Sequence, residues 1–229
     1  MDPTRPDARL EARGLTVELR GDDAIVRVLD DVTISVAPRE IVDVAGASGA
    51  GKSTLLRALT RLLPISRGEL FLDGRPAADI PPSEWRAAVA LLPQKPAMVA
   101  GDVRSNLLLP WTLKVRAQHP APTADALREG LDALELDAIS LDRDVARMSM
   151  GQQARVALLR VMLTEPAVLL LDEPDAALDM ASALAVMSGV RLFVDKGGSV
   201  LRVRHRETDG LASRRLNLSC GRLVEEASS

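Results

Sequence analysis

The residues with the clearest chemical potential lie at positions 46–53, which read GASGAGKS. They match the spacing G-x-x-x-x-G-K-[ST], in which glycines let backbone N–H groups curl around phosphate oxygens. The run follows IVDVA at 41–45 and precedes an apolar helix-forming segment, whose N-terminus favours an anion. We expect Lys52 to reach the β- and γ-phosphates of a nucleotide and Ser53 to hold Mg²⁺. The predicted phosphate-binding residues are Gly46, Ala47, Ser48, Gly49, Ala50, Gly51, Lys52, Ser53 and Thr54.

A pair of carboxylates forms the second candidate, in the sequence AVLLLDEP at 167–174. The apolar run predicts a buried strand that ends at Asp172, at the edge where open α/β sheets bind ligands. We expect Asp172 to orient Mg²⁺ and Glu173 to polarise an attacking water. The two carboxylates could instead cap a helix and face solvent, but the phosphate-binding pattern favours the catalytic interpretation.

One of the two histidines is also placed where chemistry could occur. His205 comes 33 residues after Asp172 and follows SVLRV at 199–203, a predicted strand. At a strand end beside Asp172, its imidazole could face the γ-phosphate, although a lone histidine is otherwise an ordinary surface or core residue. His119, in a proline-containing segment at 110–123, is expected to be ordinary.

The fourth candidate is a helix N-terminus that has no phosphate-binding lysine beside it. Residues 148–155 read MSMGQQAR, and an apolar, helix-forming run follows at 156–163. Ser149 and Gly151 would therefore lie at a helix N-terminus, where backbone N–H groups can bind an anion.

Two kinds of sequence must position these residues. The first 45 residues hold short β-branched runs at 15–19, 25–29 and 32–36, which predict antiparallel strands. From residue 41 onward, strand and helix patterns alternate, which predicts a parallel sheet covered by helices. Between Gln94 and Ser149 helical periodicity dominates and indicates a helical insertion. We therefore expect an α/β fold in one domain, residues 1–229, with a nucleotide-binding core at about 1–93 and 153–229 and a helical subdomain at about 94–152.

Composition limits the classes of function. The chain has 229 residues, 47% of them hydrophobic, which is enough for a sizeable core. Its formal net charge of -3 and pI of about 5.5 disfavour nucleic acid as a partner. No apolar run approaches the roughly 20 residues that span a bilayer, so we expect any membrane role to require a partner. The single cysteine, Cys220, is expected to be a small buried residue.

Six stretches in order resemble the motifs of ABC transporter ATPase subunits, which are P-loop NTPases. GASGAGKST resembles the Walker A loop, LLPQ with Gln94 the Q-loop, and MSMGQQAR the LSGGQ signature. LLLDEP resembles Walker B, AALD with Asp179 the D-loop, and VRH with His205 the switch histidine. The resemblance covers nearly the whole chain. It implies a parallel core sheet, an N-terminal antiparallel β-subdomain and an inserted α-helical subdomain.

The resemblance also implies an activity and partners. Two ATPase subunits would meet head to tail, so that each signature closes over the ATP held by the other subunit. It assigns ATP contacts across the dimer to Ser149, Gly151, Gln152 and Asp179, Mg²⁺ contacts to Ser53, Gln94 and Asp172, and catalytic roles to Glu173, His205, Lys52 and Gln94. Gln94 would pass closure to a membrane permease, which places the subunit in the cytoplasm on the inner face of the membrane.

Several residues depart from the family pattern. Met150 occupies a position that is usually glycine, and a positive φ there would cost about 1–2 kcal/mol. The chain has no tyrosine, so the aromatic residue that usually stacks on adenine is missing, and Leu19 or Arg20 takes its place. Arg39, Arg204 and Arg206 also differ from the pattern, and we interpret them as surface charges.

The kind of transporter is the least constrained property. The stretch GDVRSNLLLPWTLKVR resembles small bacterial ATPases paired with an iron-export-type permease, and Trp111 could line the permease groove. Ordinary packing inside the insertion explains that stretch equally well. Alternative functions are a non-transport ABC ATPase in iron-sulfur cluster assembly or cell-division signalling, and an ABC protein acting on DNA or ribosomes. An ABC protein that acts on DNA or ribosomes is expected to have a long coiled-coil insertion, tandem ATPase domains or a basic patch.

Overall fold

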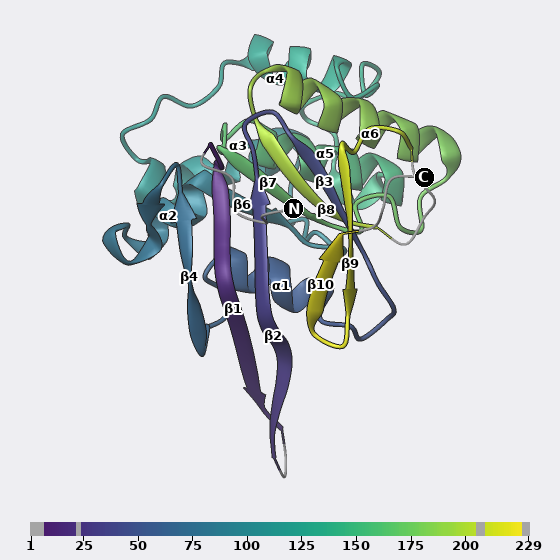
Figure 1. The fold of residues 1–229 in the computed structure, drawn as a ribbon. Coiled ribbons are helices and arrows are strands. Elements are labelled where there is room, and N and C mark those ends of the chain that lie inside the picture. The colour runs from purple at the N-terminus through teal and green to yellow at the C-terminus, as the bar shows by residue number, and fades with distance from the viewer. Residues whose placement is uncertain (1–6, 22–23, 205–208, 226–229) are drawn as a thin grey trace.

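The computed structural model describes residues 7–21, 24–204 and 209–225, and it arranges them around two β-sheets (Figure 1). Across these residues, the first sheet has four strands in the order β2-β1-β4-β5, and the second has six in the order β10-β9-β3-β8-β7-β6. The first sheet consists of β1 (Leu10–Arg20), β2 (Ile25–Val36), β4 (Arg67–Leu72) and β5 (Arg75–Pro76). The second consists of β3 (Ile41–Ala45), β6 (Val89–Leu92), β7 (Val168–Asp172), β8 (Ser199–Val203), β9 (Arg214–Ser219) and β10 (Arg222–Glu225).

The first sheet is the predicted antiparallel β-subdomain, with one difference. Strand β1 pairs antiparallel with β2, as expected, and also with β4, which the sequence did not predict. The runs at 25–29 and 32–36 do not form two strands, because they belong to the single strand β2. Leu15 lies opposite Val32 while Val17 lies opposite Leu29, so β2 carries an extra residue, and Asp31 has a φ of 55°. This β-bulge takes up the polar residues without ending the pairing.

The second sheet confirms the predicted parallel core. Strands β9, β3, β8, β7 and β6 run parallel to their neighbours, and β10 joins the edge antiparallel. Alternate residues of β7 face two cores, as a strand buried on both faces requires. Val168 and Leu170 pack with the first sheet and with α1 (Lys52–Leu59), whereas Leu169 and Leu171 pack with the other helices. Helix α1 therefore lies in the core between the two sheets.

The segment between β6 and β7 is helical, as predicted. It contains α3 (Val103–Leu108), α4 (Ala124–Asp132) and 3₁₀ turns at 109–112, 114–116 and 145–147, and it leads into α5 (Met150–Met162). Leu107, Leu131 and Leu158 share one core with α6 (Met180–Asp195) and with the sheet. The remaining helix, α2 (Pro82–Ala88), precedes β6. The predicted subdomain limits at 93/94 and 152/153 stay predictions.

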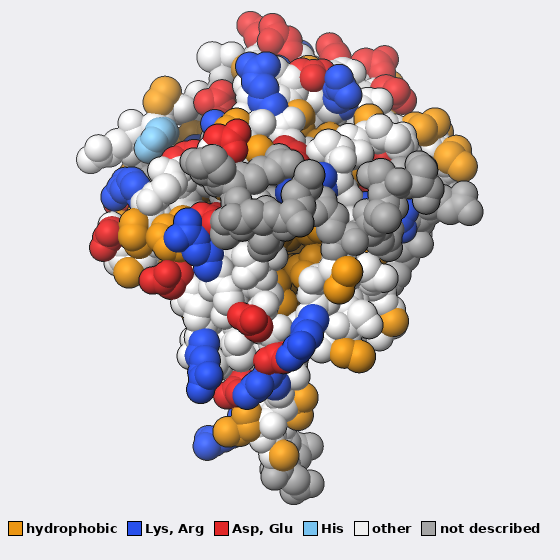
Figure 2. Space-filling view, in the orientation of Figure 1, with side chains coloured by type: hydrophobic (Ala, Val, Ile, Leu, Met, Phe, Trp, Pro, Cys, Tyr) orange, Lys and Arg blue, Asp and Glu red, His pale blue; other side chains and the backbone are white. Residues whose placement is uncertain are grey.

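Charges of both signs are interspersed on the surface. Figure 2 shows Lys and Arg next to Asp and Glu over the face viewed in Figure 1, including the β1–β2 hairpin. On that hairpin Arg27 lies 3.1 Å from Glu18 and 3.0 Å from Asp30. In the part of the chain that is described, no helix has the length and apolar character needed to cross a membrane.

Candidate nucleotide-binding and catalytic site

The glycine-rich loop joins β3 to α1, as the sequence predicts. Lys52 begins α1 and folds back over the loop, where its ammonium donates to the carbonyls of Gly46 at 2.8 Å and Ala47 at 2.9 Å. Gly51 caps the helix with a φ of 102° and without a side-chain hydrogen bond. Because no capping side chain takes up the first backbone N–H groups, this helix end has the chemistry of an anion site.

Close packing explains why the loop begins with glycine. A Cβ atom at Gly46 would lie 2.3 Å from the carbonyl oxygen of Leu218 in β9. A Cβ atom at Gly51 would lie 3.1 Å from Val28 in β2. The loop is therefore held between β9 and β2, and a side chain at Gly46 would displace it.

Asp172 ends β7 at the same edge of the sheet as the loop. In the register of the sheet Asp172 lies beside Val203, and Val203 lies beside Val44 on its other side. Since neighbouring strands are about 4.8 Å apart, Asp172 and Val44 are separated by about 10 Å. Asp172 is buried. The topology thus confirms that the Asp172 strand and the loop strand end together, with β8 between them.

Glu173 and Gln94 are in direct contact, which the sequence did not reveal. The Gln94 side chain donates from Nε2 to Oε2 of Glu173 at 2.8 Å. The two residues meet because β6 and β7 are parallel neighbours, with Leu92 beside Leu171. Glu173 has a φ of 50°, a conformation that costs about 1–3 kcal/mol and persists where the surrounding structure imposes it. Gln94 also lines a cavity of about 260 Å³ with Met150 and Ala177.

The MSMGQQAR segment begins α5, as expected, and Ser149 is its N-cap. The Ser149 hydroxyl accepts from the backbone N of Gln152 at 3.2 Å, and the Gln152 side chain accepts from the backbone N of Ser149 at 3.0 Å. This reciprocal capping box fixes the first turn of the helix. Thus part of what Ser149 and Gln152 do is structural.

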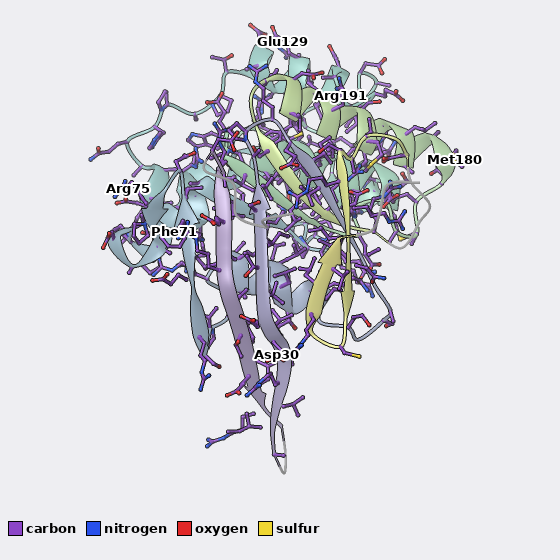
Figure 3. All side chains as sticks on the ribbon, viewed as in Figure 1. Asp30, Phe71, Arg75, Glu129, Met180 and Arg191 are labelled. Atoms are coloured by element: carbon purple, nitrogen blue, oxygen red, sulfur yellow. The ribbon has the colours of Figure 1, made fainter. Side chains whose placement is uncertain are left out.

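Gly151 brings the starts of α5 and α6 together. A Cβ atom at Gly151 would lie 2.2 Å from Oγ of Ser182, in the first turn of α6. Asp179 caps α6 by accepting from the backbone N of Ser182 at 2.9 Å and from its hydroxyl at 3.0 Å. These hydrogen bonds lower the pKa of Asp179, and the bond from the backbone N of Ser182 has the larger effect. The two predicted cross-dimer motifs are therefore adjacent within one subunit, and Met180 lies at the outer end of α6 (Figure 3).

Met150 does not carry the backbone strain that the family glycine would suggest. It is the first residue of α5, outside the set of residues with positive φ, and its side chain is 69% exposed. Replacing Met150 with glycine would therefore relieve no backbone strain, and glycine is the poorer helix former.

We predict that Met150→Gly lowers the free energy of unfolding by at most about 1 kcal/mol, since it only weakens helix propensity. Denaturant unfolding of the two proteins measures this difference. A stabilisation of 1–2 kcal/mol would contradict the right-handed backbone at Met150. The ATP turnover of the wild type and of Met150→Gly then shows whether the methionine side chain itself affects activity.

The candidate adenine contacts lie on β1. Leu19 is half-buried and packs against the core beneath the first sheet, whereas Arg20 is exposed. Leu19 pairs with Val26 of β2, two residues before Val28, which lies against Gly51. Leu19 therefore belongs to the hairpin that borders the phosphate loop, and its contact with adenine stays a prediction.

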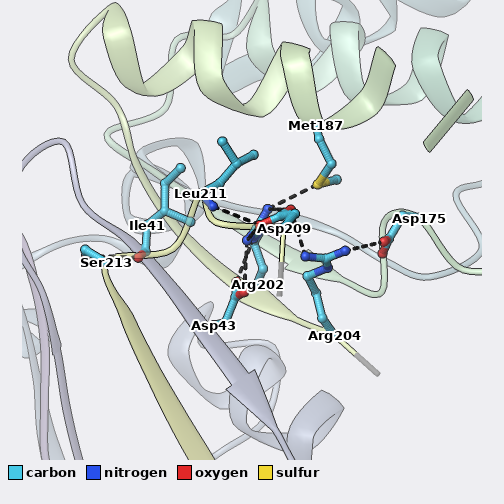
Figure 4. A network of polar contacts seen from close by, with 9 residues as sticks. All are labelled: Ile41, Asp43, Asp175, Met187, Arg202, Arg204, Asp209, Leu211 and Ser213. Carbon is cyan, nitrogen blue, oxygen red and sulfur yellow. Dashed lines mark hydrogen bonds and ion pairs between the residues drawn. The ribbon is translucent and has the colours of Figure 1, made fainter. Parts of the chain in front are cut away.

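Two buried arginines, Arg202 in β8 and Arg204 directly after it, form an ion network (Figure 4). Arg202, with no exposed side-chain surface, donates to both oxygens of Asp43 in β3 at 2.6 and 2.9 Å and to Asp209 at 2.9 and 3.1 Å. Arg204 is 2.8 Å from Asp175 and 2.7 Å from Asp209. The expectation that Arg204 is a surface charge was wrong, because partner carboxylates let it be buried.

Asp209 should make the free energy of unfolding depend on pH in the acidic range. Burial raises its pKa, but hydrogen bonds from Arg202 and the backbone N of Leu211 outweigh burial, so the pKa is lowered overall. A carboxylate with a lowered pKa stabilises the fold above its unfolded pKa of about 4, and this stabilisation is lost as pH falls through the folded value. We predict that Asp209→Asn costs about 2–3 kcal/mol at pH 7 and flattens the decline in stability below pH 4. Denaturant unfolding at several pH values tests this, and an unchanged slope would argue against it.

Other predicted positions have mixed outcomes. His205 and Arg206 lie outside the described residues. Arg39 and His119 are exposed, as expected. Cys220 is exposed, contrary to expectation, because it forms the β9–β10 turn with a φ of 48°. Trp111 is half-buried and donates to the Pro120 carbonyl at 3.0 Å.

The parallel sheet, the glycine-rich loop and the adjoining carboxylates define a P-loop nucleotide-binding fold. The sequence model of the ABC transporter family matches residues 29–176. The chain belongs to this family, as an ABC ATPase that binds ATP.

Named relatives agree with this class. The chain is similar to the hemin import ATP-binding protein HmuV of Nocardia farcinica, with 39% identity over 89% of this chain and 71% of the relative. It is similar to the Fe(3+) ions import ATP-binding protein FbpC of Streptomyces coelicolor, with 35% identity over 96% of this chain and 62% of the relative. A solved structure of an ATP-binding subunit of an ABC transporter superposes with a TM-score of 0.79 and 26% identity, covering 95% of this chain and 89% of that one.

Proposed function

We propose that this chain powers a transporter, in which ATP-driven pairing of two copies drives a separate membrane permease. The observation that carries the proposal is the 2.8 Å hydrogen bond between Gln94 and Glu173. It holds a carboxylate beside the phosphate-loop edge, where a general base can take a proton from an attacking water. Because Gln94 leads into the helical insertion, one contact joins hydrolysis to movement of that insertion.

The same site suits Mg²⁺. The Ser53 hydroxyl, the Asp172 carboxylate and the Gln94 amide oxygen are hard oxygen donors, which Mg²⁺ prefers. Gln94 uses its amide nitrogen on Glu173, so its amide oxygen can serve the ion. When bound with ATP, Mg²⁺ would neutralise charge on the β- and γ-phosphates.

Each remaining site residue has one proposed task. Lys52 places its charge on the β- and γ-phosphates, and the amides of the loop enclose them. Glu173 accepts the proton of the attacking water, and Gln94 keeps that carboxylate oriented. His205 contacts the γ-phosphate.

Pairing of two subunits would complete the site. Ser149, Gly151, Gln152 and Asp179 would meet the ATP that is held by the partner subunit, where the start of α5 supplies backbone N–H groups. The exposed Met150, Met180 and Leu184 support an interface, because they place apolar side chains around the adjoining helix starts. Loss of the γ-phosphate would remove a ligand shared by both halves and open the dimer.

Leu19 offers a test of the adenine contact. We predict that Leu19→Tyr tightens ATP about tenfold, because aromatic stacking on a base contributes about 1–3 kcal/mol. Equilibrium binding of ATP measures the change, with Ile25→Tyr, on the opposite face of the same hairpin, as the control. Unchanged affinity in Leu19→Tyr would remove Leu19 from the adenine site.

The permease and the cellular location are tested by copurification. We propose that the subunit sits on the cytoplasmic face of the membrane, bound to a multi-span permease through the Gln94 segment and the insertion. Extraction in detergent should recover such a permease with the tagged chain. Recovery of a soluble scaffold from a membrane-free fraction would support iron-sulfur assembly or cell-division signalling instead.

For cargo, we propose iron or another metal, moved outward. The names of the hemin and Fe(3+) relatives support iron as the cargo, although both names describe import. The resemblance of GDVRSNLLLPWTLKVR to iron-export-type subunits is the argument for export. Asn106 in this stretch also stabilises the local structure, because its side chain forms hydrogen bonds with both the backbone N and the carbonyl of Val99. Transport of radioactive iron into inverted vesicles with the copurified permease distinguishes export from import.

A further inference from the structure

The buried ion network connects two parts of the site, the strand before the phosphate loop and the turn after β7. Arg204 bonds Asp175, which is two residues after Glu173, and pairs with Asp209 (Figure 4). Its neighbour Arg202 grips Asp43 in β3, the strand that leads into the phosphate loop. The network therefore joins the loop strand to the turn that follows β7.

That turn needs outside support. Glu173 and Ala177 have φ values of 50° and 59°, which residues with side chains rarely adopt. Within the turn, the backbone N of Ala176 donates to Glu173 at 3.1 Å, and that of Leu178 to Asp175 at 3.5 Å. Such conformations persist only where the surroundings determine them.

Two contacts, one with the last residue of β8 and one with Arg204 directly after it, supply this support. The backbone N of Glu173 donates to the carbonyl of Val203 at 3.0 Å, and the Arg204 guanidinium holds Asp175 at 2.8 Å. Asp175 is 3% exposed and Arg204 is 7% exposed, so water screens their attraction little. The backbone N of Arg204 also donates to Val44 of β3 at 3.2 Å, which fixes the arginine itself.

We propose that Arg204 is a positioning residue for ATP hydrolysis. Through Asp175 it holds the turn after β7, so that the Glu173 carboxylate stays against Gln94 and in line with the phosphate loop. This inference rests on the proposed role of Glu173 as the group that takes a proton from water. Arg204 acts on the rate of the chemical step and leaves the loop that binds ATP unchanged.

The test is steady-state ATP hydrolysis by Asp175→Asn, which keeps the shape of the side chain and removes its charge. We expect kcat to fall about tenfold while KM for ATP stays within about twofold. Glu11→Gln is the matched control, because it removes the charge from another buried carboxylate, which pairs with Arg13 at 2.8 Å on β1. The control should keep the wild-type kcat.

A double-mutant cycle separates positioning from general destabilisation. Arg204→Met should lower kcat as Asp175→Asn does, and the double variant should be no slower than the slower single variant, because both changes remove the ion pair between Arg204 and Asp175. In single-turnover assays, Asp175→Asn should slow Glu173→Gln by less than about twofold, since the carboxylate to be positioned is gone. Multiplicative losses in both experiments would overturn the proposal.

Two further outcomes are decisive. If Asp175→Asn unfolds, Asp175→Glu takes its place, and kcat within about threefold of wild type supports the ion pair while a loss as large as that of Arg204→Met overturns it. If Glu173→Gln hydrolyses ATP as fast as wild type, the proposed function itself fails. A slow Glu173→Gln beside a wild-type kcat in Asp175→Asn rejects only the role of Arg204.

Discussion

Glu173→Gln is expected to bind ATP, to accumulate as a dimer and to hydrolyse ATP about 10²–10⁴-fold more slowly than the wild type. The amide oxygen of glutamine can still accept from Gln94, so the geometry at the end of β7 is preserved. What is lost is the group that can take a proton from water. With ATP retained, the surfaces around the starts of α5 and α6 would stay closed on the partner.

The measurements are ATP hydrolysis and light scattering on a sizing column, with and without ATP. Glu165→Gln is the matched control, since Glu165 also has a positive φ, 49°, but precedes β7 rather than following it. The control should hydrolyse ATP at the wild-type rate. Rapid turnover by Glu173→Gln would refute its role as the proton acceptor, and a monomer with bound ATP would refute pairing driven by ATP.

Lys52→Ala is expected to fail one step earlier, at ATP binding. Removing a charged group that touches phosphate should weaken ATP about a hundredfold or more, which corresponds to about 2.7 kcal/mol. The loss should be larger than for a surface lysine, because Lys52 is buried and its ammonium also bonds two carbonyls of the loop. Isothermal titration calorimetry measures the affinity, and sizing with ATP should find a monomer.

Lys196→Ala serves as the control for charge, since Lys196 is exposed at the end of α6. It should bind ATP with wild-type affinity. Wild-type affinity in Lys52→Ala is incompatible with the proposed phosphate contact. Together the two variants separate two steps of the ATPase cycle. Glu173→Gln should trap the ATP-bound dimer, whereas Lys52→Ala should never form it.

The parts of the fold that could be predicted are those written in local sequence. The glycine-rich loop, the buried strand before Asp172 and the helical insertion each have a short-range pattern, and all three are confirmed. Strands β4, β6, β9 and β10 were not predicted because their apolar or alternating stretches are short; β6 is VALL, and only LNLS alternates in β9, which reads RRLNLS. Their pairing partners lie far away in the chain, and pairing is what makes them strands.

The site was predicted as a set of residues but not as a set of contacts. Gln94 and Glu173 are 79 positions apart, and only the parallel pairing of β6 with β7 joins them. The buried arginines were missed because an arginine is normally exposed, and Arg202 and Arg204 find their carboxylates on other strands and turns. Cys220 was misjudged for the opposite reason, since a turn brings a residue that is usually buried to the surface.

The packing of Gly151 against Ser182 has a mechanical consequence. A Cβ atom at Gly151 would stand 2.2 Å from the Ser182 hydroxyl, so the backbone at the start of α5 lies directly against a side chain at the start of α6. We expect a displacement of one helix start to carry the other with it, because close-packed groups transmit strain. The segments that resemble the signature and the D-loop would then move as one unit, and a partner that pushes on either segment would move both.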